Sequence, residues 1–148
     1  ARGLFARYGK TVTEDCVHKA YDVFEGITAY VQRIMHDVFT ETVTGGTADV
    51  DLVDNMIDRF IEESSRRIRE QLSVITEQQK ELLYAIHSEG VAKGLTASAF
   101  VKRHRLKSAS SVQSATKQLL EMDLITKEGN EYTLSDPLLK LWLTREIQ

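Results

Sequence analysis

The sequence predicts a mainly helical protein made of two small units, a helical bundle followed by a set of short helices that closes with a β-hairpin. Three observations predict this arrangement. Apolar residues recur every three or four positions through most of the 148 residues, as in amphipathic helices. Glycines at 26 and 45–46 divide the first half of the chain into separate helices. Only residues 124–134 are typical of strands.

Residues 1–75 are predicted to form the helical bundle. An apolar stripe over residues 17–24 indicates one helix, and a second stripe over residues 30–38 begins after Gly26. Thr47 or Asp49 can then cap a longer helix, because short polar side chains at this position accept from the first free backbone N–H groups. The charged face of that helix is expected to lie in solvent.

Residues 76–148 are predicted to form the second unit, and each of its helices has a start signal. Thr76 and Gln79 have the spacing of a capping box, in which each side chain accepts from the backbone of the other. Thr96 is expected to cap a second, short helix, and Ser108 a third that runs to Met122.

The end of the chain completes this second unit. Two short strands, 124–127 and 131–134, are joined by a turn at 128–130. Asp136-Pro137 then opens a last helix, since proline is tolerated at the first helical position. The order helix, helix, helix, strand, strand, helix is that of a winged helix-turn-helix. The predicted fold class is therefore a mainly α protein, with a small helical bundle followed by a winged helix-turn-helix that carries a short β-hairpin.

Composition excludes several classes of protein. The longest apolar runs are only a few residues long, so none approaches the roughly 20 residues that cross a bilayer, and no membrane partner is expected. The lone Cys16 cannot form an internal disulfide, which favours the reducing cytoplasm. Residues 1–75 carry 9 basic and 13 acidic side chains, whereas residues 76–148 carry 10 and 9. The two units are therefore expected to meet different surroundings.

No catalytic or metal-binding pattern is present in the sequence. The four histidines lack the close i, i+4 spacing of a helical metal site, and the carboxylates are spread along helix faces. Cys16 has neither a paired histidine nor a glycine-rich turn beside it, so a buried apolar role is favoured over a nucleophilic one. We therefore predict no catalytic residue and no bound metal.

Four segments carry a resemblance to a known family. Residues 76–83, 108–113 and 136–143 resemble the C-terminal end of the archaeal-type AAA+/STAND P-loop ATPases, which also occur in bacteria. Residues 24–32 resemble the lid segment of that family, although Ile27 and Thr28 replace the usual His-Pro. In this family a P-loop core binds ATP, a helical lid closes over the nucleotide, and a winged helix follows.

The resemblance implies that this chain holds only the last two parts. No Gly-x-x-x-x-Gly-Lys-Ser/Thr occurs in the sequence, so the backbone that would cradle phosphates is missing. We therefore expect no enzyme activity and no cofactor in this chain alone. ATP and Mg²⁺ are implied for an upstream P-loop core, which would be the chain's partner in a longer protein.

Three residues of the lid segment are candidates for the neighbourhood of the nucleotide. The family often places a phosphate-sensing arginine about three residues beyond the glycine, and this chain has Ala29 there. Tyr30, Gln32 and Arg33 could still approach the nucleotide in the longer protein. In the alternative interpretation, Tyr30 packs in the bundle, Gln32 is a polar surface residue and Arg33 is a solvated charge. This alternative is favoured about two to one, because short motifs are weak signals.

Eight residues of the second unit are candidates for DNA binding. Cations that could contact phosphates are Lys102, Arg103, Arg105, Lys107 and Lys117, and side chains that could contact base edges are Ser111, Gln113 and Ser114. The turn of the hairpin, Glu128-Gly129-Asn130-Glu131, is acidic and is expected to repel phosphate. Winged helices also serve as protein-docking modules, so a protein partner remains the alternative to double-stranded DNA.

The sequence thus supports two functions. The first is the C-terminal regulatory or effector part of an AAA+/STAND-type ATPase, with the lid as part of the nucleotide switch and the winged helix contacting DNA or protein. The second is a stand-alone winged-helix DNA-binding transcription regulator. The lid-like bundle favours the first, because it matches a lid better than a pair of dimerisation helices.

Overall fold

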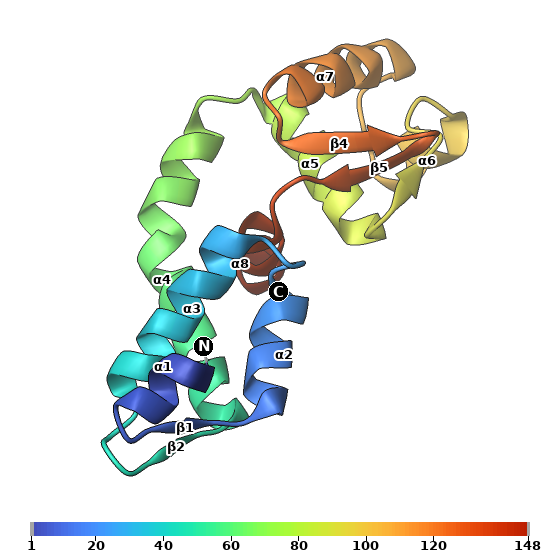
Figure 1. The fold of residues 1–148 in the computed structure, drawn as a ribbon. Coiled ribbons are helices and arrows are strands. Elements are labelled where there is room, and N and C mark those ends of the chain that lie inside the picture. Colours follow the sequence, from blue (N-terminus) through green and yellow to red (C-terminus); the bar gives the residue numbers. More distant parts are fainter. Residues whose placement is uncertain (1, 148) are drawn as a thin grey trace. The chain divides into compact units, whose positions relative to one another are not determined.

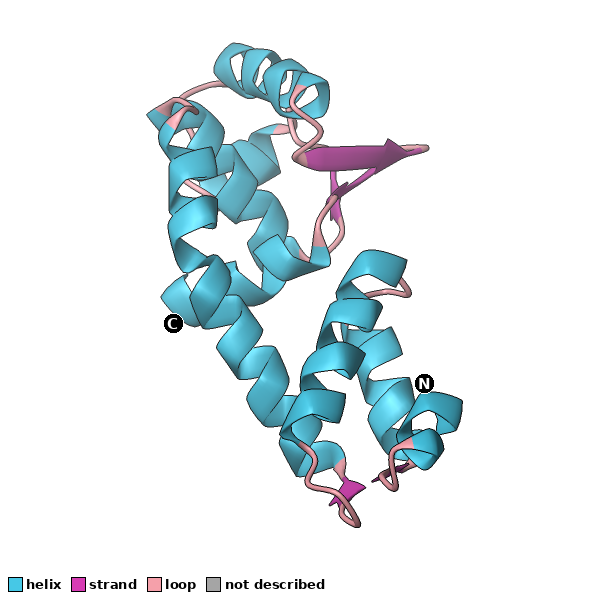
Figure 2. Cartoon of the chain, turned by 60° about the vertical axis from the view of Figure 1, so that its left-hand side comes forward, coloured by secondary structure: helices cyan, strands magenta, loops and turns pink. Residues whose placement is uncertain are grey.

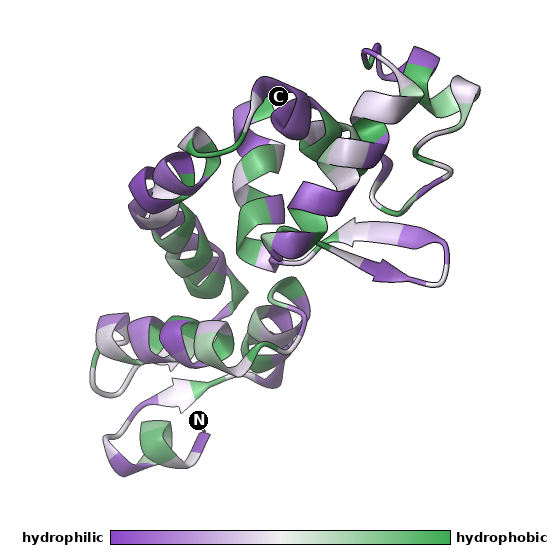
Figure 3. Ribbon diagram, turned by 90° about the horizontal axis from the view of Figure 1, so that it is seen from above, coloured by the Kyte–Doolittle hydropathy of each residue, from purple (hydrophilic) through white to green (hydrophobic). Residues whose placement is uncertain are grey.

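The computed structural model describes residues 2–147, and its chain forms two compact units that divide between Ser64 and Ser65 (Figure 1). Both units are built mainly from helices, as the sequence predicts, and strands form only small parts of each (Figure 2). Hydrophobic and hydrophilic residues alternate along the helices, as expected for amphipathic segments that bury one face (Figure 3). No helix of residues 2–147 has the length and apolar character needed to span a membrane.

The first unit is a helical bundle with a very short sheet. Its elements are α1 (Arg2–Arg7), β1 (Thr11–Val12), α2 (Glu14–Val23), α3 (Thr28–Glu41), β2 (Thr47–Ala48) and the first part of α4 (Val50–Ser73). The two strands pair in parallel, with Thr11 opposite Thr47. Phe24, Ile34 and Val38 are fully buried, and they come from the apolar stripes that predict the helices.

The second unit has the predicted order of elements. It contains the end of α4, then α5 (Glu77–Glu89), β3 (Ala92–Lys93), α6 (Ser98–Arg103), α7 (Ala109–Glu121), β4 (Ile125–Glu128), β5 (Glu131–Leu134) and α8 (Pro137–Ile147). The strands form one antiparallel sheet in the order β3-β5-β4. Strand β3 is an addition to the prediction, because a strand of two residues is too short to give a periodic signal.

Most of the predicted caps are present. Thr76 Oγ1 accepts from the backbone of Gln79 at 3.2 Å, and the Gln79 side chain accepts from Thr76 at 3.1 Å. Asp49, one of the two residues considered for α4, accepts from the Leu52 backbone at 3.0 Å. The prediction for Thr96 is wrong, because α6 begins one residue later, after Ala97, with no side-chain cap.

The boundary between the units differs from the predicted one at residue 75. The last part of α4 belongs to the second unit, where the indole N–H of Trp142 donates to Ser65 Oγ at 3.0 Å. Arg69 lies over the Trp142 ring at 5.8 Å and pairs with Glu146 at 3.4 Å. Because α4 is one continuous helix, its sequence contains no break at which a boundary could be recognised.

This boundary predicts the stability of two fragments. Residues 65–148 should unfold cooperatively, whereas residues 76–148 should lose about 3 kcal/mol or more of unfolding free energy, because burial of an Ile or Leu side chain contributes about 1.5–3 kcal/mol. The missing segment contains Ile68 and Leu72, both buried. Urea unfolding followed by the fluorescence of Trp142, the chain's one tryptophan, measures the difference. Equal midpoints for the two fragments would place the boundary at residue 75 after all.

Cys16 lies in the core of the first unit, on α2, and is fully buried. Burial, and to a smaller degree the nearby Asp49 carboxylate, raise the pKa of the Cys16 thiol to about 11. The thiolate is the reactive form, so at pH 8 the folded protein should react with a disulfide reagent at least about 100-fold more slowly than the protein in urea. Rapid labelling of the folded protein would show that this core opens easily.

Candidate nucleic-acid interface

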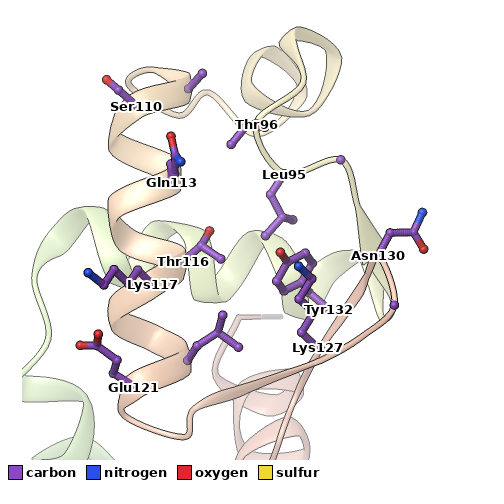
Figure 4. A pocket seen from close by; sticks show the side chains of 14 residues that line it. Leu95, Thr96, Ser110, Gln113, Thr116, Lys117, Glu121, Lys127, Asn130 and Tyr132 are labelled. Atoms are coloured by element: carbon purple, nitrogen blue, oxygen red, sulfur yellow. The ribbon is translucent and has the colours of Figure 1, made fainter.

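An open groove of about 980 Å³ lies between α7 and the β4–β5 hairpin (Figure 4). Side chains from three parts of the second unit line it: α7, the hairpin and the loop before α6. The polar residues of its lining, labelled in Figure 4, are Thr96, Ser110, Gln113, Thr116, Lys117, Glu121, Lys127, Asn130 and Tyr132. The groove therefore brings together residues that are more than 30 positions apart in the sequence.

Helix α7 forms one wall of the groove. Its buried face consists of Val112, Ala115, Thr116 and Leu119, so the opposite face is left to polar side chains. Gln113 and Lys117 are exposed there, one helical turn apart. Neither side chain forms an ion pair or a hydrogen bond with any residue between 2 and 147. Both are free to bind a ligand that enters the groove.

The hairpin forms the other wall, and its pairing register separates its charges. Lys127 lies opposite Tyr132, and both line the groove. Because side chains alternate between the two faces of a strand, Glu128 and Glu131 lie on the opposite face of the sheet. There Glu131 pairs with Lys93 of β3 at 3.4 Å.

This register corrects one expectation from the sequence. The outer half of the hairpin is hydrophilic, as predicted (Figure 3), but its carboxylates do not face the groove. The groove side of the hairpin presents instead the ammonium group of Lys127, which lies 5.6 Å from the centroid of the Tyr132 ring. Sequence reasoning missed Lys127 and Tyr132, although the alternation of side chains in a hairpin is a signal that could have identified them.

Ser111, predicted as a base contact, takes part in the cap of α7. Its hydroxyl donates to the Ser108 carbonyl at 2.9 Å and accepts from the Ser108 backbone N–H at 3.2 Å. Ser108 in turn accepts from the Ser111 backbone at 3.1 Å, which completes a capping box. The Ser111 hydroxyl is therefore engaged in starting α7, whereas Ser110 and Ser114 are exposed on the same helix.

The predicted cations at the turn between α6 and α7 fall into two groups. Arg103 pairs with Glu89 of α5 at 3.1 Å. Lys102, Arg105 and Lys107 are exposed and have no acidic partner in the part of the chain that the structure describes. Of the eight predicted residues, the groove itself contains Gln113 and Lys117, while the three free cations lie before the start of α7.

Comparison with known families assigns the second unit to a protein family. A family model described as a probable winged helix domain matches residues 67–145, which is more than half of the chain. The chain belongs to this winged helix family. The match begins inside α4, which agrees with the place of Ser65 and Arg69 in the second unit. A search of curated proteins found no match.

Outside the winged helix domain, the structure places the three candidates for nucleotide binding in the first unit. Tyr30 packs against the rings of Phe24 at 5.3 Å and Phe60 at 5.8 Å, and Gln32 is exposed. Arg33 donates to Asp37 at 2.9 Å and to Glu63 at 2.7 Å. With two carboxylates on its guanidinium, Arg33 does not fit a role as a phosphate ligand in this arrangement.

Candidate metal ligands are not gathered at any point of residues 2–147: no group of three or more His, Cys, Asp or Glu side chains could hold an ion. The two histidines of the winged helix domain have separate partners. His87 Nε2 lies 3.2 Å from Thr144 Oγ1, and His104 Nε2 lies 2.7 Å from Glu89 Oε1.

Glu89 at the end of α5 contacts both Arg103 of α6 and His104 of the following turn. The hydrogen bond with His104, and the charges of Arg103 and His104, hold the pKa of the Glu89 carboxyl below its ordinary value of 4.5, although partial burial opposes the shift. A carboxyl with a lowered pKa in the folded state stabilises the fold above its ordinary pKa. That contribution to stability is lost as the pH falls from 4.5 to the lower pKa that Glu89 has in the folded state, and below it.

The variant E89Q tests this contribution. Its stability should depend less steeply on pH below 4.5 than that of the wild type, because glutamine cannot take up the proton. Urea unfolding at a series of pH values between 5 and 3 measures the slope. The matched control is E128Q, since Glu128 has no cationic partner among residues 2–147, and it should keep the wild-type slope. If stability depended equally steeply on pH in E89Q and in the wild type, the lowered pKa of Glu89 would be contradicted.

Proposed function

We propose that the winged helix domain binds double-stranded DNA through the groove between α7 and the β4–β5 hairpin. The observation that supports this most is the pair of ammonium groups on the two walls, Lys117 and Lys127. Neither has an acidic partner within residues 2–147, and both line the same groove. Cations that are not neutralised by their own protein are the groups that bind phosphate and release its counterions.

The local charge supports the same proposal. The chain as a whole has a net charge of −3. Residues 94–127, which contain α6, the turn and α7, carry six Lys or Arg and two Asp or Glu side chains, a net charge of +4. The hairpin carboxylates that would oppose a phosphate lie on the other face of the sheet. An anionic partner is therefore attracted to one side of a domain whose overall charge is close to neutral.

Between these cations α7 offers uncharged hydrogen-bonding side chains. Gln113 lines the groove, and Ser110 lies one turn nearer the start of the helix (Figure 4). An amide can donate to and accept from the edge of adenine, whereas phosphate contacts carry no sequence information. The exposed face of α7 thus carries the Gln113 amide and the hydroxyl groups of Ser110 and Ser114. We therefore expect binding that tolerates many sequences and shows a modest preference at one base pair.

We further propose that this chain is the lid and effector part of an AAA+/STAND-type ATPase. Support comes from the resemblance of residues 24–32, 76–83, 108–113 and 136–143 to that family. The expected upstream P-loop core would supply ATP and Mg²⁺ binding, and the helical bundle would form part of the nucleotide switch. The chain alone is expected to be inactive, because its sequence has no P-loop. A stand-alone DNA-binding regulator would use the same groove.

The double variant K117E/K127E tests the DNA proposal. Fluorescence anisotropy with a labelled duplex should show weak wild-type binding that decreases steeply with salt, and the double variant should bind far more weakly. Each neutralised phosphate contributes about 0.9 to the slope of log affinity against log salt, so the slope should fall by about 1.8.

The control is K93E, which reverses one lysine charge on the opposite face of the sheet and is therefore compared with each of the single variants K117E and K127E. It should retain the wild-type salt slope, and circular dichroism should show that each variant is folded. No anisotropy change for the wild type at low salt would refute DNA binding and leave the protein-docking alternative. Equal loss in K93E and in the single variants K117E and K127E would show that the effect comes from overall charge and not from the groove.

A further inference from the structure

We infer that a second cavity of the winged helix domain, bounded by α5 and α8, binds a small organic ammonium ion, with Glu81 as the group that pairs with its charge. The cavity has a volume of about 590 Å³, within the range of small-molecule sites in proteins. It shares no lining residue with the groove between α7 and the hairpin. The inference therefore does not depend on DNA binding.

Three parts of the second unit surround the cavity: one side of α5, the turn that follows α6, and the last turn of α8. Among the described residues that line it, Glu81 is the one carboxylate, and no lysine or arginine is present. Apolar surface comes from Ala85 and from Ile147, which is 53% exposed. The cavity thus combines an apolar part with a single negative charge.

The hydrogen bonds of α8 determine which nitrogen of His87 is free. The Thr144 hydroxyl donates its one proton to the Lys140 carbonyl at 2.8 Å, so Thr144 Oγ1 accepts from His87 Nε2, which lies 3.2 Å away. Burial, and to a smaller degree the charge of Lys140, lower the pKa of His87 below its ordinary value of 6.5. The imidazole is therefore neutral at neutral pH, with its proton on Nε2 and Nδ1 left as an acceptor.

The other polar side chains of the cavity also offer mainly acceptors. The Ser88 hydroxyl donates to the Ala85 carbonyl at 2.9 Å, which leaves its lone pairs available. The Glu81 carboxylate is exposed and forms no ion pair with residues 2–147. His104 also lines the cavity, and its Nε2 lies 2.7 Å from Glu89 Oε1, so that proton is already engaged.

Tyr84 supplies both a donor and an aromatic ring. Its phenol is half-buried and has no hydrogen-bond partner within residues 2–147. Burial, and to a smaller degree the charge of Glu77, raise the pKa of the Tyr84 phenol, so it keeps its proton at neutral pH. One phenol proton is little for an anionic ligand, since phosphates and carboxylates are bound by several donors or by cations.

A ligand that fits this cavity has the opposite set of groups. A primary ammonium ion carries a positive charge and three donors and has no acceptor. Its charge matches the Glu81 carboxylate, its donors match the lone pairs of His87 and Ser88, and the face of the Tyr84 ring attracts cations. An apolar group attached to the amine would contact Ile147. The ligand class is therefore a small amine with an apolar substituent.

Three probes of similar size test the charge of the ligand: 2-phenylethylamine, the neutral 2-phenylethanol and the anion phenylacetate. Added to the full chain, the amine should shift the amide NMR signals of residues 81–88 and 144–147 and leave those of groove residues 113–117 and 127–132 in place. It should bind about 10-fold more tightly than the alcohol, because hydrogen bonds between charged partners are the stronger ones. Phenylacetate should produce no shift in either region.

The variant E81Q removes the charge of Glu81 and keeps the shape of the side chain. It should lower the affinity for 2-phenylethylamine about 10-fold and leave the affinity for 2-phenylethanol unchanged. The matched control is E128Q, the same change on the hairpin, outside the cavity, and it should bind both probes as the wild type does. Both glutamates are exposed, so thermal unfolding should show that the variants remain folded.

Four results would overturn the inference. One is the absence of any shift with the amine. Equal affinity for amine and alcohol would show that the cavity selects apolar groups without regard to charge, and binding of phenylacetate in preference to the amine would reverse the expected sign. Equal affinities of E81Q and E128Q for the amine would show that Glu81 has no special part. None of these results bears on the groove, so the proposed function is tested separately.

Discussion

In the β4–β5 hairpin, Ile125 lies opposite Leu134 and Lys127 lies opposite Tyr132, and the character of the candidate site depends on this register. Ile125 and Leu134 are buried, which holds the pairing in place, because a slip by one residue would move both side chains to solvent. The same register directs Lys127 towards α7 and places Glu128 and Glu131 on the other face. A hairpin whose composition is acidic therefore presents a cation to the groove.

The second wall of the groove depends on how α7 begins and what it buries. Ser108 and Ser111 satisfy each other's backbone N–H groups, so the helix starts at a defined residue. Val112 and Leu119 then fix its rotation in the core, which leaves Gln113 and Lys117 exposed. The end of α4 contributes to the same core, since Ser65 and Arg69 contact Trp142 of α8.

The two units differ in how they use their charges. In the first unit Glu63 is within 4 Å of both Arg33 and Arg59, and Asp37 also contacts Arg33. Charges that neutralise one another in this way are poor ligands for a substrate phosphate, because binding would first have to break existing pairs. In the winged helix domain the cations of the turn, of α7 and of the hairpin have no such partners. For this reason we propose an anionic partner for the winged helix domain and not for the first unit.

Local patterns in the sequence determined the helices, most of their caps and the order of elements that identifies a winged helix. Such signals lie within a few residues of one another: Thr76 with Gln79, Ser108 at the start of α7, Asp136 before Pro137. Tertiary structure alone decided which polar groups are free. Arg103 is bound by Glu89, fourteen residues before it, and Arg33 by Glu63, thirty residues after it. Lys117 and Lys127 line one groove for a similar reason: contacts between distant residues depend on how helices and strands pack, and no local pattern encodes them.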